Sequence, residues 1–277
     1  MIMLGATAER GRIAPALVFT FIWMTIVYCP IANWVWNENG WSYVMGTLDY
    51  AGGGPVHVSS GVGALAYSIW LGKRKGWGTA ALAYKPQNTT FVVLGTVLLW
   101  FGWFGFNGGS GLGANMRAAQ AIIVTNIAAA TGGLTWMLLD WRLERKWSAV
   151  GFCSGAISGL VCVTPASGYI GAPASLAFGV VGAIACNYAT KLKGVFGYDD
   201  AIDIFATHGI GGMVGNVLTG ESQTLQHALS SWEGELLAYY VLLCCSSDLQ
   251  PSLPIPESQP SMEPKSMVDG LITTGSS

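Results

Sequence analysis

Seven apolar stretches, each about long enough to cross a bilayer, constrain the fold of this chain more than any other feature. A transmembrane helix needs about 17–25 predominantly apolar residues, and such stretches occupy residues 14–36, 54–72, 91–106, 121–140, 148–165, 172–190 and 201–219. Only 10% of the residues are charged, against roughly 25% in an average soluble domain. The sequence therefore predicts an all-α polytopic membrane protein with about seven full spans.

The basic residues between these stretches predict the orientation of the chain. Eleven of the thirteen Lys and Arg residues lie in four alternate segments: Arg10, Arg12, Lys73, Arg74, Lys75, Lys85, Arg142, Arg145, Lys146, Lys191 and Lys193. Because basic loops remain on the cytoplasmic side of membrane proteins, we expect these segments to face the cytoplasm. The segment 37–49 then lies outside, and Asp199 and Asp200 lie inside.

The sequence contains no motif typical of an enzyme or of a metal-binding protein. There is no phosphate-binding loop, no nucleophile with a base, and no metal-ligand spacing among the six cysteines. We therefore expect no enzyme activity, no metal, no cofactor and no nucleic-acid partner. The 38 glycines instead indicate closely packed helices, since small residues let transmembrane helices approach one another.

The same phrase, an aspartate followed eight residues later by a histidine, occurs in two of the apolar stretches. It runs from Asp49 to His57 and from Asp200 to His208. The first phrase enters the membrane from the outside and the second from the inside, as in the inverted repeats of transporters. At 1.5 Å per residue each histidine lies about 12 Å below its aspartate, near mid-bilayer. We therefore expect the two histidines to meet in one pathway.

Several segments together carry a resemblance to a known family. They read GATAERGRIAP, PIANWVWNENGW, LDYAGGGPVHVSSG, WFGWFGFNGGSGLGAN, FCSGAISGLVCVTPASGYI and DDAIDIFATHGIGGMVGN, and they span roughly residues 1–220. This text resembles the ammonium transporters of the Amt/Mep/Rh superfamily, most closely the fungal Mep branch. The resemblance implies the ammonium-transporter fold of inverted repeats and a homotrimer of independent pores. It also implies transport of ammonium, ammonia or methylammonium across a lipid bilayer, with the plasma membrane as the expected location.

The resemblance also implies which residues form the pathway. Trp36, Phe106 and Ser110 match the outer site where the family recruits NH4+, and Asp49 matches the aspartate beside that entrance. His57 and His208 match the twin histidines deeper in the pore, which the resemblance implies conduct NH3 with a separate proton relay. The second gating phenylalanine of the family lies upstream of the segment where this sequence begins.

Each of these residues also has a purely structural interpretation. Trp36 suits an interfacial aromatic belt, and Phe106, close to Trp103 and Phe104 in the sequence, suits a lipid-facing or core position. Ser110 suits a small packing residue, and each histidine alone suits helix packing. Asp49 and Asp200 sit where a carboxylate caps a helix, with Asp199 and Asp203 as further capping candidates.

The family has about eleven spans, so the resemblance implies that about seven full spans are retained here, with truncation at both ends. We expect a partial transporter domain in residues 1–220 and a divergent, disordered tail rich in Ser and Pro in residues 221–277. Three alternatives to ammonium transport stay open: an Rh-type channel for NH3 or CO2, an ammonium sensor, and an inactive truncated fragment.

Overall fold

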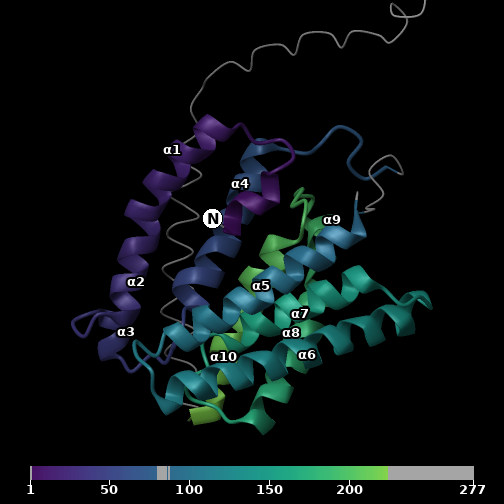
Figure 1. The fold of residues 1–277 in the computed structure, drawn as a ribbon. Coiled ribbons are helices and arrows are strands. Elements are labelled where there is room, and N and C mark those ends of the chain that lie inside the picture. The colour runs from purple at the N-terminus through teal and green to yellow at the C-terminus, as the bar shows by residue number, and fades with distance from the viewer. Residues whose placement is uncertain (1, 80–85, 87, 224–277) are drawn as a thin grey trace, which may run out of the picture.

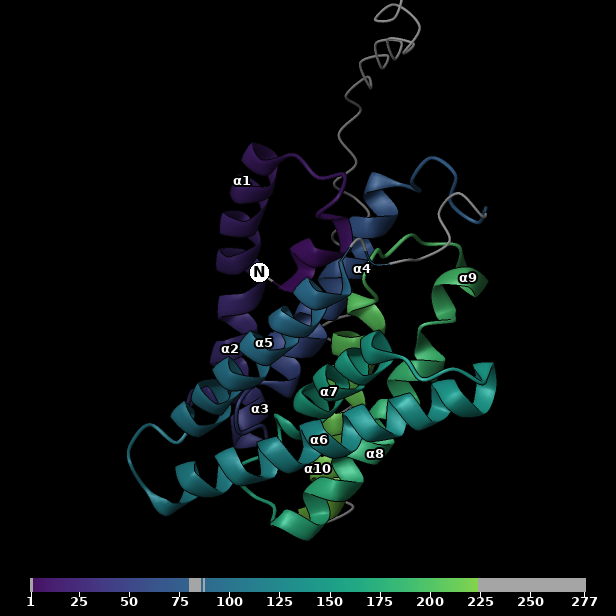
Figure 2. The ribbon, with the colours of Figure 1, turned by 45° about the vertical axis from the view of Figure 1, so that its right-hand side comes forward.

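The computed structural model describes residues 2–79, 86 and 88–223, and this part of the chain is built from helices joined by short segments (Figures 1 and 2). The helices, in chain order, are η1 Ile2–Thr7, α1 Ile13–Trp23, η2 Met24–Tyr28, α2 Cys29–Trp36, α3 Trp41–Val44, η3 Gly53–Val58, α4 Ser59–Leu71, α5 Thr89–Gly109, α6 Met116–Glu144, α7 Ala149–Val163, α8 Ala172–Ala189, α9 Leu192–Phe196, η5 Phe205–Ile210 and α10 Gly211–Gln223. No strand occurs among the described residues. The expected all-α class is confirmed.

Helices overlap each of the seven predicted spans, and several of their bounds differ from the predicted ones by a few residues. Four of them are long and apolar enough to cross a membrane: Ile13–Val44, Thr89–Gly109, Met116–Glu144 and Ala172–Phe196. Ala149–Val163 is a shorter apolar helix, and the two histidine-bearing spans are η3 with α4 and η5 with α10. The predicted tail falls almost wholly on residues 224–277, which lie outside the described residues.

The best-packed part of the fold is the group formed by α6, α7 and α8 (Figure 1). Its core joins Val124 and Ala128 of α6 to Cys162 of α7 and Phe178 of α8, all at most 4% exposed. A Cβ atom at Gly159 would collide with the backbone carbonyl of Ala128. The close packing that the glycine content indicates is therefore confirmed at this crossing.

In contrast, α1, α2 and α5 present apolar side chains outward. Phe21 is 73% exposed and Phe101 is 74% exposed. Only 6% of the most apolar window of Ile13–Val44 and 11% of that of Thr89–Gly109 is buried. Exposing these apolar faces to water would be unfavourable, because apolar surface is more stable when it is removed from water. These helices are suited to a lipid environment or to contact with further helices.

Three helical stretches have the wider π-helical turn, namely η2, η3 and η5. In η3 the N–H of His57 donates to the carbonyl of Gly52, five residues earlier, at 3.1 Å. π-Helical turns are rare and occur frequently at functional sites. Both predicted histidines lie in such turns, a feature that the apolar pattern of the sequence did not predict.

The two histidine-bearing segments cross at a point where their backbones are in direct contact. A Cβ atom at Gly61 of α4 would collide with the backbone nitrogen of Gly209 in η5. Only a residue without a side chain permits this approach. The crossing brings the middle of the second span against the middle of the last one, as the inverted arrangement requires.

Candidate functional site

The site begins with Asp49, which lies just before η3 and is 4% exposed. Its Oδ1 accepts hydrogen bonds from the N–H groups of Gly52 and Gly53 at 2.7 and 2.8 Å, and its Oδ2 accepts one from Gly54 at 2.7 Å. Gly52 has a φ of +117°, which L side chains rarely adopt. The capping interpretation of Asp49 is therefore confirmed: its carboxylate holds the free N–H groups at the start of the first histidine-bearing helix.

Trp36 lies beside this cap. Its Nε1–H donates to the backbone carbonyl of Asp49 at 2.9 Å, and its ring packs close to Gly52, since a Cβ there would meet the indole at 3.2 Å. The side chain remains 38% exposed. The indole is thus anchored to the Asp49 segment while part of it stays open to the outside.

The two predicted histidines meet. The Nδ1 atoms of His57 and His208 are 3.1 Å apart, and the ring centroids are 5.2 Å apart. The side chains are 1% and 7% exposed. At this separation one Nδ1 donates and the other accepts, so the pair shares one hydrogen bond. The Nε2 of His57 is buried with no hydrogen-bond partner among the described residues.

Two aromatic rings of α5 cover the histidine pair. The ring of Trp103 stacks on His57 with centroids 5.3 Å apart and planes inclined by 16°, and it lies 6.4 Å from His208. Phe106 lies 6.0 Å from the His57 ring and is 37% exposed. The spacing of three residues places both rings on one face of the helix. Phe106 is thus partly exposed and also lies against the histidine pair, so neither the lipid-facing nor the core interpretation alone describes its position.

Trp103 is a site residue that the sequence reasoning missed. It is 7% exposed, and its Nε1–H donates to the hydroxyl of Thr164 in the segment after α7, at 2.9 Å. Thr164 in turn donates to the carbonyl of Leu160 at 2.8 Å. The signal available in the sequence was the spacing of Trp103 and Phe106, one helical turn apart.

Ser110 ends α5. Its hydroxyl donates to the carbonyl of Phe106, in its own helix, at 2.8 Å. Among the described residues, Ser110 forms no hydrogen bond to Trp36 or Asp49. The structure thus brings together Trp36 with Asp49 and Phe106 with His57, while Ser110 is joined only to the Phe106 turn.

Asp200 repeats the Asp49 arrangement at the opposite end. Its Oδ2 accepts a hydrogen bond from the N–H of Phe205 at 2.8 Å, so it caps the second histidine-bearing helix as expected. We expected the carboxylates of Asp199 and Asp203 to help cap this helix, and they do not. Asp199 instead pairs with Arg74, and Asp203 pairs with Lys193 at 2.8 Å, because basic side chains reach both carboxylates.

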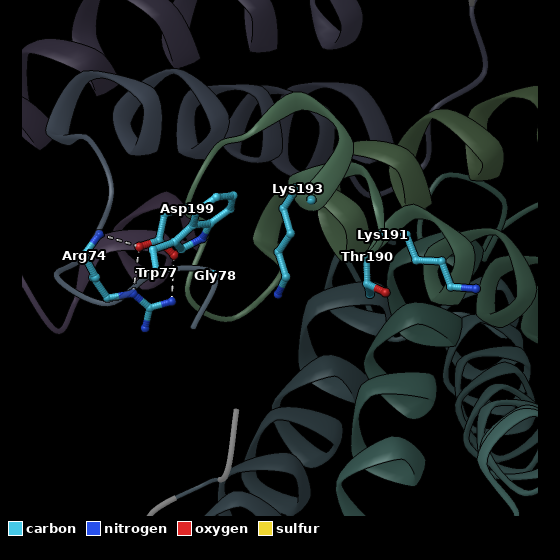
Figure 3. A pocket seen from close by; sticks show the side chains of 8 residues that line it. Arg74, Trp77, Gly78, Thr190, Lys191, Lys193 and Asp199 are labelled. Atoms are coloured by element: carbon cyan, nitrogen blue, oxygen red, sulfur yellow. Dashed lines mark hydrogen bonds and ion pairs between the residues drawn. The ribbon is translucent and has the colours of Figure 1, made fainter. Parts of the chain in front are cut away.

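Basic segments far apart in the sequence meet around Asp199. Arg74 donates to both of its carboxylate oxygens, at 2.8 and 2.6 Å, and Arg10 donates to its backbone carbonyl at 2.6 Å. Arg74 and Asp199 line a cavity of about 490 Å³ together with Lys191 and Lys193. Figure 3 shows these side chains and the contacts between Arg74 and Asp199. Three of the four basic segments thus lie on one face, as the orientation rule predicts.

These charges lower the pKa of Asp199. Its burial alone would raise the pKa, but hydrogen bonds from Arg74 and the charges of Arg74 and Arg10 outweigh burial and bring the pKa below its usual value. Because the Asp199 carboxylate pairs with both Arg74 and Arg10, it fixes these two segments to each other.

The fold and the site define a class. A bundle of apolar helices, with a buried histidine pair where two oppositely directed helices cross, is a multi-pass membrane protein of the transporter and channel class.

The family follows from comparison with known proteins. A model described as Ammonium Transporter Family matches residues 1–241, and this chain belongs to the ammonium transporter family. Members of this family are transporters and not enzymes.

Individual relatives agree with that assignment. Ammonium transporter 1 of Schizosaccharomyces pombe is 56% identical over 216 residues, covering 78% of this chain and 43% of the relative. Ammonium transporter MEP2 of Saccharomyces cerevisiae is 53% identical over 222 residues, covering 79% and 44%. The crystal structure of Saccharomyces cerevisiae Mep2 superposes with a TM-score of 0.83 at 45% identity, covering 90% of this chain and 62% of that one. The chain spans less than half the length of these two curated relatives.

Proposed function

We propose that this chain forms part of an ammonium transporter in which NH4+ is recruited outside, loses its proton, and passes as NH3 along His57 and His208. The observation that carries the proposal is the buried hydrogen bond between these two histidines, 3.1 Å long, in a chain of the ammonium transporter family. An ionisable residue inside a membrane is costly, so its presence calls for a functional explanation. We extend the proposal to a homotrimer in the plasma membrane.

Recruitment must offset the cost of removing a cation from water, which is at least about 2.5–3.5 kcal/mol at the bilayer centre. The partly exposed indole of Trp36 can supply a cation-π contact of about 0.5–2 kcal/mol. The negative charge of Asp49 lies beneath it, joined through its backbone carbonyl. In this proposal the hydroxyl oxygen of Ser110 accepts a hydrogen bond from NH4+, because the hydroxyl hydrogen already donates to the carbonyl of Phe106.

Phe106 then separates the recruiting site from the histidines. Its ring lies against both His57 and Trp103, with centroids 6.0 and 5.7 Å away. An apolar ring there excludes a hydrated ion, so only a species that sheds its charge proceeds cheaply. K+ has no proton to lose, which gives the pathway a means of discrimination.

The histidine pair suits a neutral passenger and a separate proton. When one Nδ1 donates and the other accepts, the two Nε2 atoms have opposite hydrogen-bonding character, one acceptor and one donor. NH3 has both a lone pair and N–H groups, so it can bond to either ring. When the acceptor Nε2 takes up a proton, the shared proton moves to the other ring, and that ring releases its own Nε2 proton; this reverses the polarity of the line and completes one step of an imidazole relay.

The test is substitution of His208 by alanine in a full-length version of the transporter, with uptake of methylammonium measured in a fungal host that lacks its own ammonium uptake. We expect uptake to fall to background. Ser222→Ala in α10, the helix that follows η5 directly, is the control, because Ser222 is exposed and bonds only locally, and it should keep normal uptake. Normal uptake by the His208 variant at equal surface expression would refute the relay.

A current measurement separates the proposed transporter from an Rh-type gas channel and from an ammonium sensor. A transporter that recruits NH4+ and passes the proton separately produces inward current during uptake, whereas an Rh-type gas channel does not. A sensor binds ammonium and gives neither flux nor current.

A further inference from the structure

The turn between α6 and α7, which the distribution of basic residues predicts to face the cytoplasm, has a well-defined structure. Helix α6 ends at Arg145, whose φ of +59° is left-handed and whose N–H donates to the carbonyl of Trp141 at 3.0 Å. The next helix starts at once, because the Ser148 hydroxyl oxygen accepts the N–H of Gly151 at 2.9 Å. The side chains of the turn are thus held on a fixed backbone.

Two exposed tryptophans pack together on this turn. The rings of Trp141 and Trp147 are stacked, with centroids 5.6 Å apart and planes inclined by 16°. They are 40% and 60% exposed. The guanidinium of Arg145 lies over the Trp141 ring at 5.4 Å. Tryptophan gathers at membrane interfaces because its ring is apolar and its N–H is polar.

The turn carries an excess of positive charge. It holds Arg142, Arg145 and Lys146 against Glu144, and all four side chains are exposed. No carboxylate among the described residues lies within 4.0 Å of these three basic groups, since the ion pairs in that part of the chain involve only Arg10, Arg74 and Lys193. Lys193 and Arg74 are neutralised by aspartates, and the turn is not.

The length of α6 sets the depth of the turn. Met116–Glu144 has 29 residues, which at 1.5 Å each extend about 43 Å. The hydrocarbon core is about 30 Å thick, and the whole bilayer with headgroups is about 40–45 Å. The helix therefore runs through the hydrocarbon and emerges at the headgroups of the inner leaflet, where its last turn and the basic residues lie.

We propose that the α6–α7 turn binds the headgroup of an anionic phospholipid of the inner leaflet. The headgroup phosphate accepts hydrogen bonds from Arg142 and Lys146, and the paired tryptophan rings lie against the glycerol and the upper acyl chain. Charge complementarity and depth both select this occupant. The inference uses the orientation of the chain and does not depend on the proposed transport.

The test is a titration of the detergent-solubilised full chain with phosphatidylserine, followed by thermal unfolding, with phosphatidylcholine of the same acyl chains as the reference. We expect phosphatidylserine to raise the unfolding temperature at lower concentration. The double variant Arg142→Gln/Lys146→Gln should weaken the phosphatidylserine effect by about 30-fold, or about fivefold per charge removed. This variant leaves both tryptophans and the left-handed Arg145 in place, and its unfolding temperature without lipid shows whether it folds.

The matched control is Arg12→Gln/Lys75→Gln, which removes two exposed positive charges from the same face. It should retain the response of the unsubstituted chain. Equal responses to the two lipids, or equal loss in both double variants, would overturn the proposal. Inorganic phosphate reproducing the full stabilisation would overturn it too, because the acyl chain and tryptophans would then contribute nothing.

Discussion

Replacing Asp49 by asparagine tests whether this residue acts mainly as a cap. Its carboxylate uses both oxygens to accept three N–H groups, two on Oδ1 and one on Oδ2. An amide has a single oxygen, so one buried N–H would face an NH2 group. Leaving a buried donor unpaired costs about 1–3 kcal/mol, and losing the negative charge at a helix start costs about 0.3–1 kcal/mol more. We expect a loss of about 2 kcal/mol.

Asp200→Asn is the matched control, because the same residue type at the inverted position is used differently. Its Oδ2 accepts the N–H of Phe205, and its Oδ1 has no hydrogen-bond partner among the described residues. An asparagine can keep its oxygen on Phe205 and place its NH2 group at the other position. Only the charge term of about 0.3–1 kcal/mol remains.

The assay is thermal unfolding of the two variants in detergent beside the unsubstituted chain. About 2 kcal/mol corresponds to a fall of about 4–8 °C for a protein of this size. The unfolding temperature should fall by that amount for Asp49→Asn and by less than half of it for Asp200→Asn. An unchanged unfolding temperature for Asp49→Asn, accompanied by weaker uptake, would refute the capping argument and favour an electrostatic role.

Three further predictions concern packing and charge. Thr164→Val should cost about 1–3 kcal/mol by leaving the buried indole N–H of Trp103 unpaired, while Thr164→Ser should keep it, as unfolding curves will show. Gly61→Ala should prevent the helix crossing and abolish folded protein on size-exclusion chromatography, whereas Gly95→Ala, with open space around it, should be neutral or stabilising by up to about 1 kcal/mol. The pKa of Asp199 in the folded protein lies below its unfolded value of about 3.9, so its ion pair should stabilise the fold above about pH 4. This contribution to the free energy of unfolding should be lost as the pH falls through the folded pKa. The Asp199→Asn variant should therefore show a smaller loss of stability at acidic pH, measured by unfolding at several pH values.

The spans were predictable because the length of an apolar stretch and the basic residues beside it can both be read directly along the sequence. Residues 172–190 were predicted as a span, and the helix runs over Ala172–Ala189. The prediction for residues 121–140 was too short, since α6 continues to Glu144. Its last turn contains Arg142 and Glu144, so a search for apolar length ends before the helix does. The short 3₁₀-helix Ile2–Thr7 lies outside the seven predicted spans, because its six residues are far fewer than a membrane crossing needs.

The site was partly predictable. The meeting of His57 and His208 followed from equal depth in opposite directions, which needs only residue counts. The stacking of Trp103 did not follow, because residues near Phe106 point in different directions and only the three-dimensional crossing decides which face meets the histidines. The hydrogen bond from Trp103 to Thr164 joins residues 61 positions apart, a relation that no local pattern contains.

The π-helical turns at the two histidines have a consequence for insertions and deletions. A π-helical turn holds about one residue more than an α-helical turn, so deleting one residue from Gly53–Val58 or from Phe205–Ile210 would leave a regular α-helix. The imidazole would then swing about 100° around the helix axis relative to the flanking turns. A sequence could therefore retain both histidines and lose the pair. The angular phase of each histidine, set by one extra residue in each half, matters as much as its identity.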